Sequence, residues 1–165
     1  MDFEIRSSMR SIEVVSVHRQ RGLASGPEPT LPGTDMTTDL LYLALTIGLG
    51  VVQIVAASHA ASRVRGYAWS AGARDTALPP LEGVAGRLAR AVTNYGETFP
   101  FFVAAVLLAH QTGRVGATVD LGAALYFWAR VAYVILYALG VPIARSLAWN
   151  TAILGIAMIL WRVLA

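Results

Sequence analysis

Three polar residues interrupt an apolar stretch in the middle of the chain at a spacing that could bind a small charged molecule. Arg90, Asn94 and Glu97 are separated by four and three positions, so in a helix they share one face. A guanidinium binds a carboxylate through two parallel hydrogen bonds, and a glutamate beside an amide can accept hydrogen bonds from an ammonium group. These residues therefore predict a helix face that binds a small charged ligand.

A second polar face follows in the next apolar segment. Arg130, Tyr133 and Tyr137 are spaced i, i+3 and i+7, which again places them on one side of a helix. If the two helices are antiparallel, a rise of about 1.5 Å per residue puts Glu97 and Arg130 at depths of roughly 15 and 16 Å from their shared end. The remaining residues match in the same way, so we expect the two faces to oppose one another layer by layer.

Basic residues outnumber acidic ones on these faces. Arg145 follows the second face after a short turn and joins Arg90 and Arg130, whereas the only carboxylate is Glu97. A bare charge at the centre of a bilayer costs at least ~3 kcal/mol on insertion scales, so Glu97 is expected to pair with an arginine. One interpretation is that this pair only ties the helices together. The surplus positive charge favours the other interpretation, an anionic ligand bound between them.

The residue types that the chain lacks exclude several kinds of chemistry. All 13 basic residues are arginine and there is no cysteine, so Schiff-base lysines, thiolate nucleophiles, disulfides and cysteine-ligated metals are excluded. His59 and His110 stand alone near the ends of apolar segments, and two isolated histidines predict no metal site. The arginines are scattered through an apolar chain, so we predict no binding to nucleic acid.

The elements that must position these residues are membrane helices. Of the 165 residues, 56% are hydrophobic and only 14% are charged, against about 25% in soluble domains. A helix needs roughly 20 residues to cross the hydrocarbon core. Four segments meet this length, the second one only with its polar first half, at about residues 40–58, 87–110, 119–141 and 147–164. The sequence therefore predicts an all-α fold, an antiparallel four-helix transmembrane bundle.

The segments outside these spans set the expected domain organisation and orientation. Residues 59–86 form a long predicted loop, and residues 36–165 make up the membrane domain. Residues 1–35 are polar, and either a disordered tail or a natural start at Met36 explains them. Counted from Met36, the first and third loops carry an excess of arginines: Arg63, Arg65, Arg74, Arg87 and Arg145. The positive-inside rule then predicts that the long loop faces the cytoplasm.

Two sequence motifs resemble those of a known family, the membrane-associated proteins in eicosanoid and glutathione metabolism (MAPEG), and suggest a bacterial-type member. The first motif reads Arg87-x-x-Arg90-Ala91-x-x-Asn94-x-x-Glu97-x-x-Pro100-x-Phe102. The second reads Ala129-Arg130-x-x-Tyr133-x-x-x-Tyr137, followed by Pro142-Ile-Ala-Arg145. The resemblance covers about residues 37–165, and residues 1–35 have no counterpart.

The resemblance implies a homotrimer that encloses glutathione, used as a co-substrate and without a metal, at subunit interfaces facing the cytosol. The residues that it implies for binding glutathione are Arg90, Asn94, Glu97, Arg130, Tyr133 and Tyr137. By the same resemblance Arg145 faces the thiol and is the catalytic residue. A thiol has an unperturbed pKa of about 8.5, which falls beside a cation, so a thiolate would form at the bilayer edge.

Three functions are compatible with these residues. The first is a glutathione-dependent membrane transferase or peroxidase acting on lipophilic electrophiles dissolved in membrane lipid. The second is a non-enzymatic member of the same family that binds an anionic lipid or another amphiphile. The third is a small drug/proton exchanger, but such proteins place a carboxylate in the first span, where this chain offers only Gln53.

Overall fold

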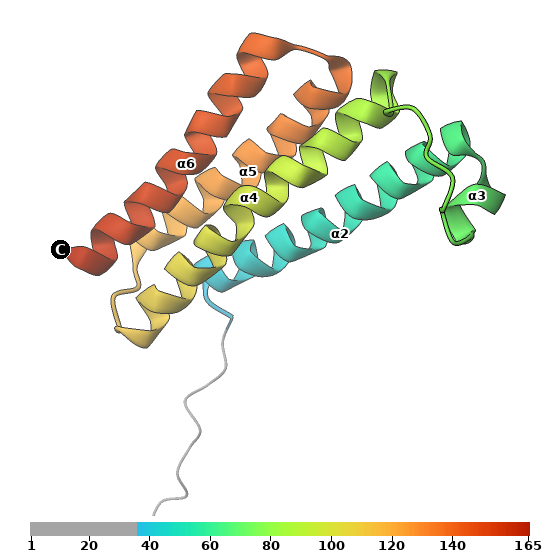
Figure 1. Ribbon diagram of the computed structural model, residues 1–165. Helices are drawn as coiled ribbons and strands as arrows, with labels where there is room; N and C mark the ends of the chain where they lie inside the picture. Colours follow the sequence, from blue (N-terminus) through green and yellow to red (C-terminus); the bar gives the residue numbers. More distant parts are fainter. Residues whose placement is uncertain (1–35) are drawn as a thin grey trace, which may run out of the picture. The chain divides into compact units, whose positions relative to one another are not determined.

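A computed structural model describes residues 36–165, and within them every regular element is a helix (Figure 1). The elements are α2 (Thr38–Arg65), α3 (Tyr67–Ala71), α4 (Gly83–Gln111), α5 (Ala117–Leu139) and α6 (Pro142–Leu164). The two interpretations of residues 1–35, a tail or an upstream misassigned start, concern a segment that lies outside the described residues.

The four long helices contain 28, 29, 23 and 23 residues and are apolar enough to cross a membrane. Each exceeds the roughly 20 residues that the hydrocarbon core requires. Large apolar side chains are exposed along all four, including Val52, Leu107, Ile135 and Leu154. Lipid is the solvent that such surfaces need, so the predicted all-α fold, a four-helix membrane bundle, is confirmed.

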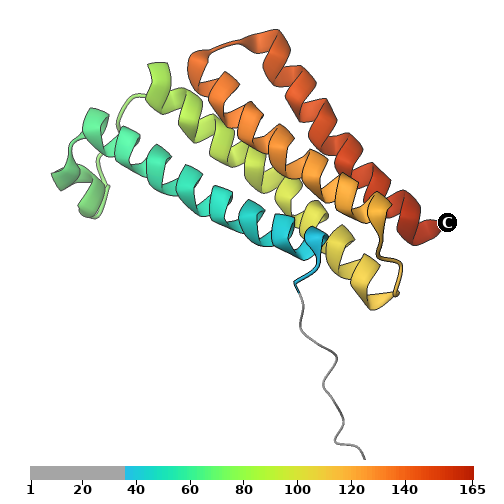
Figure 2. The same ribbon diagram turned by 180° about the vertical axis from the view of Figure 1, so that it is seen from behind.

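Consecutive long helices run antiparallel, and α4 and α5 occupy the centre of the bundle (Figures 1 and 2). Helix α2 packs on α4 and α5, whereas α6 packs on α5 and α4. The core includes Phe102 of α4, which stacks on Tyr126 of α5 with ring centroids 4.1 Å apart. The two helices that carry the predicted polar faces are therefore neighbours.

Two glycines allow α5 and α6 to approach closely. A Cβ atom at Gly122 would lie 2.7 Å from the Gly155 carbonyl oxygen, and one at Gly155 would lie 2.5 Å from that of Gly122. Small residues permit this kind of backbone contact between membrane helices. This contact holds the α6 backbone close to that of α5.

The loop predicted over residues 59–86 is shorter in the structure. Helix α2 continues to Arg65, and α3 occupies part of the remaining segment. Hydropathy falls after Ala57, but no helix-breaking residue occurs before Gly66, which ends α2 with a φ of 90°. Similarly, α6 begins at Pro142 rather than near residue 147, because proline is favoured in the first turn of a helix.

Candidate functional site

Arg130 is one of two fully buried charged residues in the described part of the chain, the other being Asp39. The Arg130 side chain is 1% exposed, although it lies in the middle of α5. Its Nη1 donates a hydrogen bond to Asn94 Oδ1 on α4, at 3.0 Å. Its Nε and Nη2 are buried and have no hydrogen-bond partner among residues 36–165. Two N–H-bearing nitrogens of a buried cation are therefore available to an acceptor that this part of the chain does not supply.

Aromatic rings surround the Arg130 guanidinium. Its central carbon lies 5.1 Å from the ring centroid of Tyr95 and 4.8 Å from that of Tyr133. Cation–π contacts of this kind contribute roughly 0.5–2 kcal/mol depending on desolvation. The rings stabilise and orient the cation, but they accept no hydrogen bond from Nε or Nη2.

Arg130 reaches Glu97 only through Asn94. The Asn94 side chain donates from Nδ2 to Glu97 Oε2, at 3.0 Å, and accepts from Arg130 through Oδ1. Within residues 36–165 no arginine forms an ion pair with a carboxylate. The expected direct pair between Glu97 and Arg130 does not form, and Arg130 bonds instead to Asn94, three residues earlier on α4. The arginine side chain is long enough to span the distance between turns, about 5.4 Å, and meets the amide instead.

The remaining residues of the second face form a column toward the start of α6. The Tyr133 and Tyr137 rings meet edge to face, with centroids 5.4 Å apart. The Arg145 guanidinium carbon lies 4.3 Å from the centroid of Tyr137. The column leads from the buried guanidinium of Arg130 to the partly exposed one of Arg145.

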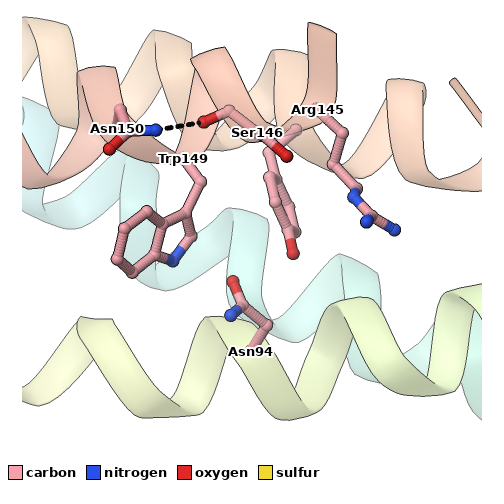
Figure 3. Close-up of a pocket in the computed structure, with 6 residues that line it drawn as sticks. Asn94, Arg145, Ser146, Trp149 and Asn150 are labelled. Carbon is pink, nitrogen blue, oxygen red and sulfur yellow. Dashed lines mark hydrogen bonds between the residues drawn. The ribbon is translucent and has the colours of Figure 1, made fainter. Parts of the chain in front are cut away.

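A pocket of about 340 Å³ opens beside this column, between α4, α5 and α6 (Figure 3). The side chains that line it are those of Asn94, Tyr133, Arg145, Ser146, Trp149 and Asn150. Trp149 points its indole nitrogen toward α4, and that nitrogen is buried without a hydrogen-bond partner among the described residues. Small-molecule sites have volumes of about 300–1,000 Å³, so the pocket can hold part or all of a small ligand.

The pocket brings together three of the seven predicted site residues, Asn94, Tyr133 and Arg145. Arg90 and Glu97 lie on α4 with exposed side chains, although Glu97 is joined to the site by its hydrogen bond from Asn94. Arg130 and Tyr137 contact the lining residues rather than lining the pocket themselves.

Sequence reasoning missed the contribution of α6. Ser146, Trp149 and Asn150 are spaced i, i+3 and i+4 and share the helix face that meets the pocket. This spacing is visible in the sequence, but the predicted span of residues 147–164 begins after Ser146.

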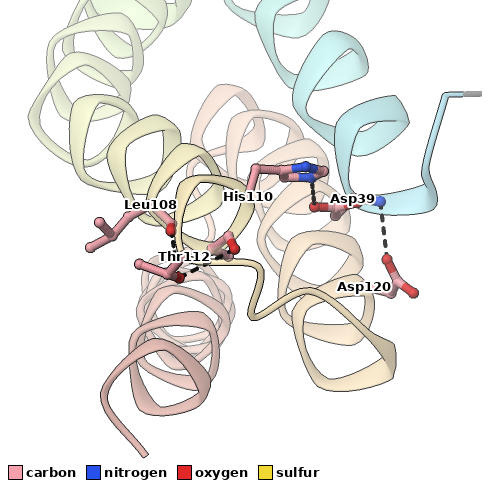
Figure 4. Close-up of polar contacts among 6 residues, drawn as sticks. Asp39, Leu108, His110, Thr112 and Asp120 are labelled. Carbon is pink, nitrogen blue, oxygen red and sulfur yellow. Dashed lines mark hydrogen bonds and ion pairs between the residues drawn. The ribbon is translucent and has the colours of Figure 1, made fainter. Parts of the chain in front are cut away.

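A second polar cluster lies at the opposite end of the bundle (Figure 4). His110 Nε2 lies 2.6 Å from Asp39 Oδ2, and the Asp39 backbone N–H donates to Asp120 Oδ1 at 3.1 Å. The Asp39 side chain is 1% exposed. The sequence analysis gave His110 no partner, because nothing in the sequence indicates that the end of α4 meets the start of α2. No group of acidic residues, histidines or cysteines within residues 36–165 could hold a metal ion.

Four membrane-crossing helices, with a pocket lined by polar side chains between three of them, define an integral membrane bundle protein. Residues 40–165 match the sequence model of the MAPEG family, and the chain belongs to that family. Comparison with curated proteins gave no significant match. Family membership supports a glutathione-related membrane function of the transferase or peroxidase type.

Proposed function

We propose that this chain is a glutathione-dependent membrane transferase or peroxidase that acts on lipophilic electrophiles. The observation that carries the proposal is the buried Arg130 guanidinium, whose Nε and Nη2 have no acceptor among residues 36–165. A buried charge without a partner is strongly destabilising, so an anion from elsewhere is the expected partner. A glutathione carboxylate supplies that charge, with two oxygens in the geometry that a guanidinium prefers.

The other groups of glutathione also have complementary partners nearby. Its ammonium group can donate hydrogen bonds to Glu97, which Asn94 already orients. Its peptide carbonyl oxygens can accept hydrogen bonds from Tyr133 and Tyr137, whose side chains lie between the two arginines. Its second carboxylate would bind Arg90, one turn before Asn94 on α4.

The proposed chemical role of Arg145 is to stabilise the thiolate form of glutathione. Arg145 lines the pocket at the start of α6, where its charge would lower the thiol pKa from its usual value of about 8.5. Each unit of lowering corresponds to about 1.4 kcal/mol. The thiolate sulfur then attacks an electrophilic carbon and displaces its leaving group, or attacks a peroxide oxygen and breaks the O–O bond.

We infer that the working form is a homotrimer, as in other family members. Arg90 and Glu97 are exposed on the polar half of α4, and charged side chains within a span normally face protein or a water-filled cavity. A neighbouring copy would cover them and complete the glutathione site. The arginine-rich segment between α2 and α4 would face the cytoplasm of a bacterium, with the chain in the inner membrane.

Calorimetry on the detergent-solubilised oligomer tests the proposal. Glutathione should bind to the wild-type protein, and Arg90→Ala and Glu97→Ala should each weaken binding. Arg162→Ala, at the far end of α6, is the matched control and should leave binding unchanged. An intact oligomer that gives no heat with glutathione would overturn the proposal.

The alternative is a non-enzymatic protein that holds an anionic lipid or another amphiphile at the same guanidinium. The unpartnered nitrogens of Arg130 would donate hydrogen bonds to a phosphate as readily as to a carboxylate. Co-purified lipid detected by native mass spectrometry, together with no conjugation of glutathione to a chlorinated nitrobenzene, would favour this alternative.

A further inference from the structure

A second pocket lies away from the glutathione site, where the end of α2 meets the segment that leads into α4. Its volume is about 220 Å³, and its lining residues are Val64, Arg65, Leu78, Pro79, Pro80 and Leu81. None of these residues lines the first pocket. The lining combines one cation with five apolar side chains, which is the composition of a site for an amphiphilic anion.

An arginine–tryptophan cluster fixes the basic side of this pocket. The guanidinium carbons of Arg65 and Arg74 lie 5.1 and 5.9 Å from the ring centroid of Trp69. The Trp69 indole N–H donates to the Thr76 carbonyl oxygen at 3.2 Å, and Arg74 donates from Nε and Nη2 to the Ser70 carbonyl oxygen at 3.0 and 2.7 Å. The Trp69 ring is therefore near two guanidinium groups, and neither forms an ion pair with a carboxylate of the described residues.

Neither arginine of this cluster lies within ion-pair distance of a carboxylate in the described residues. No arginine of residues 36–165 forms an ion pair, although Asp75 and Glu82 lie in the same segment. The Nε of Arg65 is buried and has no hydrogen-bond partner within those residues. The negative end of the α2 dipole favours a cation in this last turn, but it provides no acceptor for Nε.

The surroundings of the pocket are those of a membrane interface. Arg65 is the last residue of a helix long and apolar enough to cross the bilayer. Val64, beside it, is 65% exposed, and Tyr67 and Leu78 are exposed as well. Apolar side chains exposed next to arginines at the end of a span match the boundary between acyl chains and headgroups, where tryptophan also concentrates.

We propose that this pocket binds the phosphate group of an anionic membrane lipid. The Arg65 guanidinium, which lines the pocket, binds the phosphate oxygens, and the charge of Arg74 adds to the attraction. The acyl chains lie along Val64 and Leu78. The site would hold the segment between α2 and α4 against the membrane surface, and it does not depend on glutathione binding in the other pocket.

Native mass spectrometry of the full-length, delipidated oligomer tests this site with phosphatidylglycerol and phosphatidylcholine as probes. The wild-type protein should retain phosphatidylglycerol in preference, and Arg65→Gln should weaken that binding about tenfold, the effect of losing a charged hydrogen bond. Arg65→Lys, which keeps the charge without the Nε donor, should fall between them. Arg162→Gln is the matched control and should bind like the wild-type protein.

Three results would overturn the proposal. The two lipids share the phosphate group and differ in net charge, so equal retention would show that the net negative charge of the lipid is not recognised. Displacement of phosphatidylglycerol by low-millimolar inorganic phosphate would show a site for free phosphate rather than for lipid. Loss of glutathione binding in Arg65→Gln, with lipid binding unchanged, would assign Arg65 to the glutathione site. Circular dichroism of each variant confirms that the helices are retained.

Discussion

Two buried polar clusters of the bundle are built in opposite ways. At one end of the bundle, Asp39, His110 and Asp120 are joined by two hydrogen bonds. In the middle of α5, Arg130 uses one of its three guanidinium nitrogens, and the remaining two have no acceptor among the described residues. Both clusters contain a buried charged residue, so burial of charge alone does not identify a ligand site. The unused donors distinguish a binding site from a structural contact.

Helix ends explain why the first cluster is complete. Asp39 and Asp120 lie in the first turns of α2 and α5, and His110 lies in the last turn of α4. Acidic groups are stabilised at helix N-termini and basic groups at C-termini. Arg130 lies in the middle of its helix, where the dipole provides no such stabilisation, so its charge requires an external partner.

The largest effect is expected from removing the Arg130 cation, whose Nε and Nη2 have no partner among the described residues. Arg130→Leu should lower glutathione affinity at least about 100-fold, because it removes a bidentate charged contact. It should leave thermal stability unchanged or raised, since replacing a buried charge by an apolar side chain is often neutral or stabilising. Calorimetry and thermal denaturation of the same preparation measure the two effects. A large loss of stability without loss of binding would make Arg130 a structural residue.

The cluster of Asp39, His110 and Asp120 should respond in the opposite manner, losing stability without affecting glutathione binding. Asp39→Ala should lower the free energy of unfolding by about 2 kcal/mol, because it removes a buried, charged hydrogen bond to His110. Glutathione binding should stay within error of the wild-type value. Asp75→Ala, an exposed acidic residue, is the matched control for stability. Weakened glutathione binding in a folded Asp39→Ala protein would contradict the separation of the two clusters.

Within the pocket, Arg145 should affect the rate of reaction more than the binding of glutathione. Arg145→Gln should lower the rate of thiol conjugation about tenfold while changing glutathione affinity much less, since its charge acts on the thiolate rather than on the bound carboxylates. The pH–rate profile should also move to higher pH, because less thiolate is present at neutral pH. Equal losses in binding and in rate would assign Arg145 to binding alone.

The smallest effect is expected at Trp149, whose indole nitrogen is also buried without a hydrogen-bond partner among the described residues. Trp149→Phe removes the buried indole N–H from the pocket and keeps most of the ring. Glutathione affinity should fall about fivefold, as for loss of one neutral hydrogen bond, with thermal stability unchanged. Trp161→Phe, at a 72% exposed position on the same helix, should have no effect. Identical affinities in the two variants would show that the indole donates to no part of the ligand.

Local sequence patterns predicted the four spans and the polar faces of α4 and α5, because hydropathy and helical spacing are properties of neighbouring residues. They did not predict that the long Arg130 side chain hydrogen-bonds to Asn94 rather than to Glu97. They also gave no sign of the Gly122–Gly155 contact or of the bond between His110 and Asp39. These features depend on which helices pack together.

A density map of the purified oligomer in glutathione can show what binds Arg130. A carboxylate of the ligand should lie within hydrogen-bond distance of Arg130 Nε and Nη2, in the pocket beside Tyr133. An acidic side chain of a neighbouring copy bonded to both nitrogens, with no ligand density in the pocket, would contradict the proposed glutathione site.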